Sequence, residues 1–297
     1  MIYRYRKIIR TYRIRYWSQL MDQSSPRLDY AKKIIKEAAT DALREFSRWK
    51  HLAITEKGAQ DFVSEVDKGT ELFLRSKIEA EFPDDGIVGE EFGRTNADAD
   101  YQWVLDPIDG TANYISGVPA WCIVIALVKS EQIVAGVIYD PNHDELFSAE
   151  LGQGAYINDQ RLGPEKKFQI NNSTLSIGYS GRTTTKPVVS VINDVFKLGG
   201  VFSRNGSGAL SLAHVADQRY SGYIEHHMNA WDCLAGQLIV KEAGGLIEYQ
   251  NAQEMIALGG RVIVGWPGVF EQLLKMADEH FGEDDLVRSA LGKSPQS

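Results

Sequence analysis

The segment Trp103–Thr111 limits the possible folds most, because an apolar strand in it runs directly into two carboxylates. Its first three residues are typical of a buried strand, so Asp106 is expected at the carboxyl end of that strand. Pro107 has no N–H to continue a ladder and is expected to fix a turn. Asp109 would project from this turn, and a short helix is expected over residues 111–116.

Two carboxylates beside a helix start form a plausible site for cations and an anion. Carboxylates crowded together repel one another, and their pKa values rise unless cations neutralise them. The N–H groups at the start of the helix favour an anion such as phosphate. The segment offers oxygen ligands and no His or Cys, so the expected ion is Mg²⁺ or Mn²⁺. The same pattern would also serve as a turn with a helix cap, and both interpretations stay open at this point.

Two further acids occur at the ends of expected elements. Glu90 directly follows the short apolar strand Ile87–Gly89, and Asp232 begins a helix expected over Asp232–Ala243. Taken alone, Glu90 could be a solvent-facing strand end and Asp232 a helix N-cap. Taken together with Asp106, they are acids at element ends with no base beside them, which favours a shared metal site.

The pattern of the chain changes near residue 165. Before it, a helix is expected from Leu28 to Trp49 and a second from Asp67, as its N-cap, to Phe82, followed by short strands in a largely antiparallel meander. After it, strand and helix patterns alternate. We therefore expect an N-terminal α+β domain over residues 26–165 with most of the metal ligands. A C-terminal α/β domain over residues 166–283 would complete the site.

The two ends of the chain are expected to lie outside the fold. Residues 1–25 form a basic extension, either an arm that touches membrane or nucleic acid or an upstream extension before a start at Met21, and residues 284–297 form a tail. Residues 1–20 carry six basic residues and no acid, so the remaining 26 basic and 40 acidic residues leave the body at −14. Such an acidic body is a poor general binder of nucleic acid.

Nothing in the sequence suggests export or a membrane span. The longest apolar run, Trp121–Val128, has eight residues, far short of the ~20 that cross a bilayer. Cys122 and Cys233 lie in apolar segments and are expected to be core thiols in a reducing compartment. A cytoplasmic protein is the resulting expectation.

Three segments together resemble the signatures of the inositol monophosphatase family in order and spacing. They are Gly89-Glu90-Glu91, Trp103–Asn113 and Trp231–Gly245, and the resemblance covers roughly residues 28–280. It implies a layered α/β/α/β/α sandwich of the inositol monophosphatase / fructose-1,6-bisphosphatase type. It also implies a homodimer, inhibition by Li⁺ as in many members, and two or three Mg²⁺ ions, for which Mn²⁺ could substitute.

The resemblance assigns the metal ligands residue by residue. Glu90, Asp106 and the backbone carbonyl of Ile108 would bind a first ion. Asp106 would also bind a second ion, together with Asp109 and Asp232.

The same resemblance assigns the residues around the reacting phosphate. Asp67 and Glu90 would support a weaker third ion through waters, and Thr111 with Glu90 would orient the attacking water. The backbone N–H groups of Gly110 and Thr111 would hold the phosphate.

The substrate side matches the family less closely. Glu225 matches a hydroxyl-binding glutamate, and Gly206 and Ser207 match a loop that contacts the sugar-like part of the substrate. Asp232 is expected to contact the substrate as well as the metal. After Glu225 the chain has His226-His227, which could bind a phosphate, select another leaving group or face solvent. Gly208 stands where many members have Ala, and this change is expected to loosen the loop.

The resulting expectation is Mg²⁺-dependent hydrolysis of a small phosphate monoester by in-line attack of metal-activated water. The family resemblance makes myo-inositol 1-phosphate the expected substrate. Histidinol phosphate, sugar bisphosphates and nucleotide 3′-phosphates are the alternatives within the family. An alternative of another class is a partner of RNA or of the transcription machinery with a secondary phosphatase activity. The complete set of acids favours the enzyme.

Overall fold

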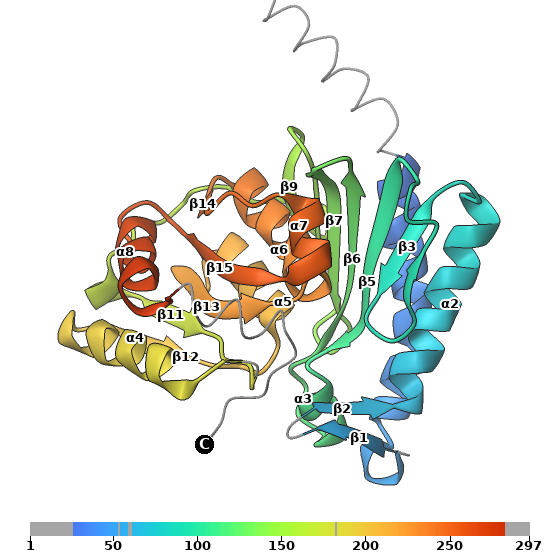
Figure 1. Ribbon diagram of the computed structural model, residues 1–297, viewed down its shortest axis with the longest axis horizontal. Helices are drawn as coiled ribbons and strands as arrows, with labels where there is room; N and C mark the ends of the chain where they lie inside the picture. Colours follow the sequence, from blue (N-terminus) through green and yellow to red (C-terminus); the bar gives the residue numbers. More distant parts are fainter. Residues whose placement is uncertain (1–25, 53, 59–60, 182, 283–297) are drawn as a thin grey trace, which may run out of the picture.

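The chain folds into two β-sheets with helices between them and on both outer faces (Figure 1). The computed structural model describes residues 26–282 apart from 53, 59–60 and 182. The larger sheet has the strand order β10-β9-β8-β7-β6-β5-β3-β4, and the smaller has β12-β11-β13-β15-β14. The architecture is the expected α/β/α/β/α sandwich. The expected extension (residues 1–25) and tail (284–297) lie outside the described residues.

Every described element has definite bounds. The helices comprise residues 26–46, α2 (Glu65–Glu81), α3 (Thr111–Ile115), α4 (Thr185–Lys197), α5 (Gly208–Ala216), α6 (Ala230–Ala243), α7 (Ala252–Leu258) and α8 (Phe270–His280), with 3₁₀ turns η1 (Trp49–His51) and η2 (Ile170–Asn172). The strands are β1 (Ile54–Gly58), β2 (Asp61–Ser64), β3 (Gly86–Gly89), β4 (Gly93–Thr95), β5 (Tyr101–Asp109), β6 (Cys122–Lys129), β7 (Gln132–Asp140), β8 (Glu145–Glu150), β9 (Gly154–Ile157), β10 (Gln160–Arg161), β11 (Thr174–Ile177), β12 (Val201–Ser203), β13 (Gly222–Met228), β14 (Leu246–Ile247) and β15 (Gly260–Gly265).

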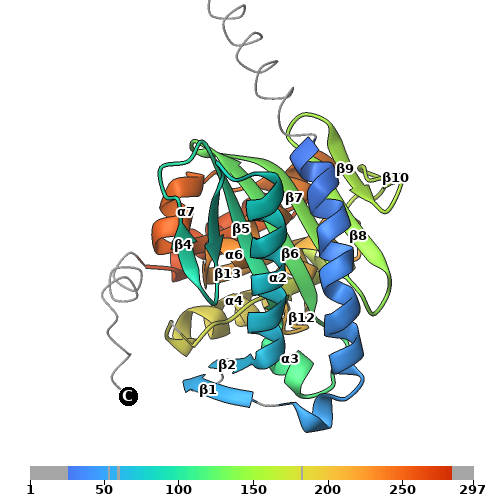
Figure 2. The ribbon, with the colours of Figure 1, turned by 90° about the vertical axis from the view of Figure 1, so that its right-hand side faces the viewer.

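Three apolar clusters fill the spaces between the five layers. The helix of residues 26–46 and α2 lie side by side over one face of the larger sheet (Figure 2). Helices α5 and α6 fill the space between the two sheets, and α4 and α8 cover the outer face of the smaller sheet. Because α5 and α6 pack against strands from both parts of the chain, the two sheets share one central core.

Strand β5 differs from the expectation at Pro107. The strand continues to Asp109 instead of turning at the proline, and its register with β6 shifts between Asp106 and Asp109. Between the pairs Asp106–Val124 and Asp109–Cys122, two residues of β5 lie opposite one residue of β6, which is a β-bulge. A bulge leaves backbone groups outside the ladder, so it accommodates a residue that lacks an N–H. The two carboxylates are therefore presented by a bulged strand.

Helix starts and strand directions also differ in part. The first helix ends at residue 46, and Trp49 lies in η1. Helix α2 begins at Glu65, which places Asp67 inside the first turn as a buried residue and not at the N-cap. The meander is antiparallel as expected except that β3 runs parallel to β5. This pairing puts the carboxyl ends of β3 and β5 at the same edge of the sheet.

A buried ion pair attaches the first helix to the sheet. Arg27 donates two hydrogen bonds to Asp85, at 2.7 and 2.8 Å, and its guanidinium lies over the ring of Tyr101. The same carboxylate accepts a hydrogen bond from Trp103 Nε1 at 2.8 Å. Asp85 thus joins the helix to the beginning of β3 and β5.

None of the helices in the described residues combines the length and the apolar character that a membrane span requires.

We predict that Gly136→Ala lowers the free energy of unfolding by about 1–3 kcal/mol, because overpacking of a close contact is destabilising. A methyl group at Gly136 in β7 would lie 2.9 Å from the backbone Cα and O atoms of Ala235 in α6. Denaturant unfolding followed by circular dichroism measures the change. Gly69 is an exposed residue in the middle of α2, and a methyl group there would meet no atom within 4 Å. Gly69→Ala should therefore raise the free energy of unfolding by about 0.5–1 kcal/mol. Equal effects of the two substitutions would contradict the close approach of β7 and α6.

Candidate active site

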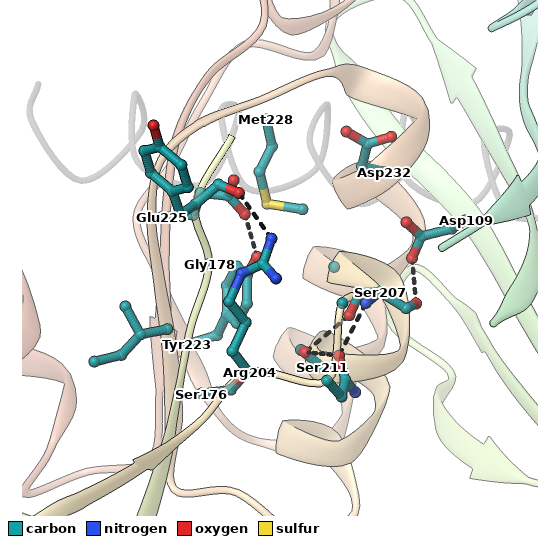
Figure 3. Close-up of a pocket in the computed structure, with 15 residues that line it drawn as sticks. Asp109, Ser176, Gly178, Arg204, Ser207, Ser211, Tyr223, Glu225, Met228 and Asp232 are labelled. Carbon is teal, nitrogen blue, oxygen red and sulfur yellow. Dashed lines mark hydrogen bonds between the residues drawn. The ribbon is translucent and has the colours of Figure 1, made fainter. Parts of the chain in front are cut away.

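Three aspartates from distant parts of the chain converge at one edge of the larger sheet. Each of Asp106, Asp109 and Asp232 offers a carboxylate oxygen, and these oxygens lie within 4.8 Å of one another. The bulge of β5 supplies the first two, and the first turn of α6 supplies the third. In Figure 3, Asp109 approaches from the strand and Asp232 from the helix above it. The structure thus brings together the three expected ligands of the second ion.

The acids around Asp106 create an unfavourable concentration of negative charge. Burial raises the pKa of Asp106 well above its ordinary value, and the nearby charges of Glu90, Asp109, Asp232 and Asp67 raise it further. Asp106 is only 1% exposed, so water screens this repulsion poorly. Bound cations would remove the repulsion, and a donor set made of carboxylate oxygens suits Mg²⁺. The residues present therefore fit the metal ions that the resemblance implies.

Asp109 is fixed by the loop that begins α5. Its Oδ2 atom accepts hydrogen bonds from Ser207 Oγ and from Ala209 N, the latter at 2.7 Å. Burial raises the pKa of Asp109, and these hydrogen bonds oppose the rise. Because they converge on Oδ2, the other carboxylate oxygen is left to face a cation. Ser207, expected as a substrate contact, thus directly orients an expected metal ligand.

Thr111 lies between two acceptors. Its Oγ1 atom is 3.1 Å from Asp67 Oδ1 and 3.0 Å from the backbone oxygen of Ile108. A hydroxyl has one proton to donate, so Thr111 donates to one of these acceptors at a time. Its lone pairs remain available to accept a proton from a water. The structure thus places Asp67, Ile108 and Thr111 together, and the expected role of Thr111 in orienting water stays a prediction.

Gly110 closes the turn before α3 with a left-handed backbone. Its φ angle is +97°, and an added Cβ atom would lie 2.9 Å from the backbone oxygen of Ala120. Both the conformation and the lack of space require glycine. The expected contact of its N–H with phosphate stays a prediction.

Asp232 occupies a different helix position from the one expected. Helix α6 begins at Ala230 with Asn229 as its N-cap, and Asp232 is the third residue of the helix. Asp232 Oδ2 accepts the backbone N–H of Asn229 at 3.2 Å, which completes a capping box. The helix start thereby orients the carboxylate. The Asp232 N-cap prediction was wrong by one helical turn.

A pocket of ≈130 Å³ opens beside the aspartates. Asp109 and Asp232 line one side of it and Glu225 lines another, with Arg204 and Met228 between them (Figure 3). Burial raises the pKa of Glu225 to about 8, while Tyr223, which donates a hydrogen bond to the carboxylate, opposes the rise. The pocket can therefore bind groups with both donors and acceptors.

Among the pocket residues that the sequence interpretation missed, Tyr223 and Arg204 carry polar groups suited to binding. Tyr223 lies two positions before Glu225 on β13, and strand periodicity places both on one face. Arg204 lies two positions before Gly206 and is the one cation among the described residues that line the pocket. The spacing to predicted site residues was a usable signal in each case.

Gly208 is closely packed, and the expected loosening of its loop stays a prediction. It is the first residue of α5, and an added Cβ atom would lie 2.5 Å from Cε of Met228. The side chain of Met228 occupies the space that the methyl group of an alanine at position 208 would need. Before it, Gly206 has a φ of +89° and packs against Asn113, whose Nδ2 donates to Asn205 O at 2.7 Å. The loop is therefore well packed.

The two histidines after Glu225 are buried in β13. His226 and His227 are 4% and 5% exposed, so the solvent-facing alternative was wrong. The ring of His226 stacks on Phe281 with a centroid distance of 4.6 Å and an interplanar angle of 12°. Neither histidine is among the described residues that line the pocket beside Asp232.

Cys122 and Cys233 are buried, as expected.

Comparison with known proteins identifies this arrangement of acids. The model of the inositol monophosphatase family matches residues 23–280. The chain belongs to the inositol monophosphatase family. The Nus factor SuhB of Haemophilus influenzae is 35% identical over 84% of this chain and 95% of its own length. The fructose-1,6-bisphosphatase/inositol-1-monophosphatase of Aquifex aeolicus is 37% identical over 84% of this chain and 94% of its own length.

Solved structures agree with this assignment. The extragenic suppressor protein SuhB of Bartonella henselae has a TM-score of 0.78 and 29% sequence identity, and the match covers 85% of this chain and 98% of that one. The relatives thus share the fold over nearly their whole length.

We predict that the metal-free protein loses stability between pH 4.5 and 8 partly through Glu225. Its pKa rises from 4.5 to about 8 on folding, so the folded state holds the proton more tightly. The resulting stabilisation is complete below pH 4.5 and is lost as the pH rises through about 8. Thermal unfolding in EDTA at pH 5 and pH 8 should therefore show a smaller pH effect in Glu225→Gln than in the wild type. An unchanged effect would refute the role of Glu225, and the exposed Glu254→Gln serves as the control.

Proposed function

We propose that the protein hydrolyses small phosphate monoesters with Mg²⁺, and that myo-inositol 1-phosphate is its substrate. The convergence of acids on the buried Asp106 supports this proposal most strongly, because such a cluster is poorly suited to stabilise a fold without cations. The family includes phosphatases by name, as in the Aquifex aeolicus relative. The cytoplasmic location, the homodimer and the sensitivity to Li⁺ belong to the same proposal.

Each expected ligand has a place in this proposal. Glu90, Asp106 and the carbonyl of Ile108 would hold one Mg²⁺, and Asp106, Asp109 and Asp232 would hold another. When bound, Mg²⁺ supplies charge neutralisation for the phosphoryl oxygens and lowers the pKa of a bound water. The N–H groups of Gly110 and Thr111 would hold the phosphate, and a weaker third ion would lie near Asp67 and Glu90.

Thr111 and Asp67 provide a path for the proton of the attacking water. Thr111 Oγ1 can accept a hydrogen bond from the water while it donates its own proton toward Asp67, 3.1 Å away. This contact orients the water and draws its proton away from the reacting oxygen. No covalent phosphoenzyme is required. The roles of Thr111, Asp67 and Glu90 in this step are parts of the proposal.

The pocket beside the aspartates favours a leaving group with several hydroxyls. Glu225 accepts hydrogen bonds and, when protonated, can donate one, while the guanidinium of Arg204 donates. A polyol presents both kinds of partner to such a pair. Gly206, Ser207 and Asp232 also line the space in which the leaving group would lie. Histidinol phosphate, sugar bisphosphates and nucleotide 3′-phosphates remain the alternatives.

A phosphate-release assay on these esters, with Mg²⁺ and with EDTA, tests the proposal. We predict the highest kcat/KM for myo-inositol 1-phosphate and no release in EDTA. Asp109→Asn should lower kcat by ~10² or more, as expected for the loss of a preorganised charge, whereas Asp159→Asn in an exposed turn should have no effect. Near-normal turnover of Asp109→Asn at saturating Mg²⁺ would contradict the assignment of that ligand.

We predict that the contact between Gly208 and Met228 controls the fit of the leaving group. Gly208→Ala would displace the end of Met228 into the pocket and raise KM more than it lowers kcat, because the metal ligands stay in place. Gly208→Ala combined with Met228→Ala should bring KM back toward the wild-type value. Steady-state kinetics of the two variants measure this. A double variant that is worse than the single one would show that Met228 does more than fill space.

The name of one relative supports a second candidate function. The Haemophilus influenzae protein is called Nus factor SuhB, so this chain could act as a partner of the transcription machinery or of RNA, with hydrolysis as a secondary activity. The basic residues among positions 1–20 agree with that role. Binding to RNA together with no phosphate release from any ester would favour this second function alone.

A further inference from the structure

A buried carboxylate outside the cluster of acids binds the turn that carries Glu90. Glu71 of α2 is fully buried. Its Oε2 atom accepts the backbone N–H of Glu91 at 2.7 Å, and its Oε1 atom accepts that of Phe92 at 3.2 Å. These are consecutive residues of the turn between β3 and β4, whose first residue is Glu90. One side chain thus satisfies two neighbouring amide groups of the turn.

An arginine on the same helix completes this arrangement. Arg75 lies one turn after Glu71, donates to Glu71 Oε1 from Nε at 2.7 Å, and donates to the backbone oxygen of Gly93 from Nη2. Its charge offsets that of Glu71 in a place where water cannot. The pair therefore binds both the start and the end of the β3–β4 turn. Strand β3 fits closely against the pair, because a Cβ atom at Gly89 would overlap with Glu71 Oε1.

The backbone of Glu90 itself contacts the strand that carries Asp106. The backbone N–H of Glu90 donates to the oxygen of Leu105 at 3.3 Å, directly before Asp106. The Glu90 backbone is thus held by β5 at its own N–H and by Glu71 at the next two. Asp67 lies one helical turn before Glu71, so a single rigid helix carries both Asp67 and the group that holds the Glu90 turn.

We propose that Glu71 is a positioning residue of the metal site, which holds Glu90 against Asp106 and so strengthens the binding of divalent cations. The inference rests on the proposed function only in that cations bind at these acids. Fixing the backbone on both sides of Glu90 limits the positions that its carboxylate can reach. Groups that orient metal ligands in this way typically change metal affinity by 10–100-fold when they are altered.

The rival explanation is that Glu71 and Arg75 only stabilise the fold. Asp85 offers a matched control for it, because Asp85 is also a buried carboxylate paired with an arginine and lies just before β3. It precedes the first residue of the strand, whereas Glu71 acts after the last. Asp85→Asn should lower thermal stability and leave cation binding unchanged.

The test is a titration of Mn²⁺ onto the full-length protein without substrate, followed by electron paramagnetic resonance of the free ion. Glu71→Gln puts an amide N–H where an oxygen now accepts one, so we expect Mn²⁺ affinity to fall by about tenfold or more. The Mg²⁺ concentration for half-maximal phosphate release should rise in parallel, with kcat recovered at high Mg²⁺. Glu71→Asp keeps the charge but withdraws it from the turn, so it should also weaken Mn²⁺ binding. This variant serves as the test if Glu71→Gln does not fold.

The outcomes separate this proposal from the proposed function. Unchanged Mn²⁺ affinity in the folded Glu71 variants, with a stability loss like that of Asp85→Asn, would overturn the positioning role. No binding of Mn²⁺ by the wild type would overturn it as well. Mn²⁺ binding by the wild type without hydrolysis of any ester would refute only the proposed activity. The difference between the Glu71 and Asp85 variants would still decide the role of Glu71.

Discussion

The repulsion among carboxylates around Asp106 is the constraint on which the other features of the site depend. Asp106 is buried, and four acids, from β5, α2, α6 and the turn after β3, raise the pKa of its carboxyl group further. A fold would not gain stability from such a cluster without cations. The surrounding structure therefore has to hold each acid firmly in its place. The holders identified in the structure are backbone amides, the hydroxyl of Ser207 and the buried carboxylate of Glu71.

The sandwich fold supplies these holders from different layers. The first turn of α5, between the sheets, binds Asp109 through Ser207 and Ala209. Helix α2, on the outer face of the larger sheet, binds the Glu90 turn through Glu71. The acids thus lie where an outer layer, a sheet and the central helical layer meet at one edge. The parallel pairing of β3 and β5 creates this edge, because it brings the ends of both strands together.

The sequence predicted the acids of the site well and the residues that pack around its pocket poorly. Asp109 ends β5, Glu90 directly follows β3, and Asp232 lies in the first turn of α6, so local periodicity placed these acids near the ends of their elements. The bulge at Pro107 was read as a turn, because local sequence does not show that β6 continues alongside the strand.

Residues that act through distant contacts could not be read in this way. His226 and His227 look like loop residues, yet β13 lies in the middle of its sheet and buries both. Glu71 looks like one charged residue of an amphipathic helix, and only the tertiary structure brings it to a turn 20 residues away. Met228 illustrates the same limit. Its side chain fills the space that a methyl group at position 208 would need, and this contact between β13 and α5 is not visible in the local sequence. The acids of the site thus lie in local sequence motifs, whereas the pocket beside them is shaped by packing between β13 and α5.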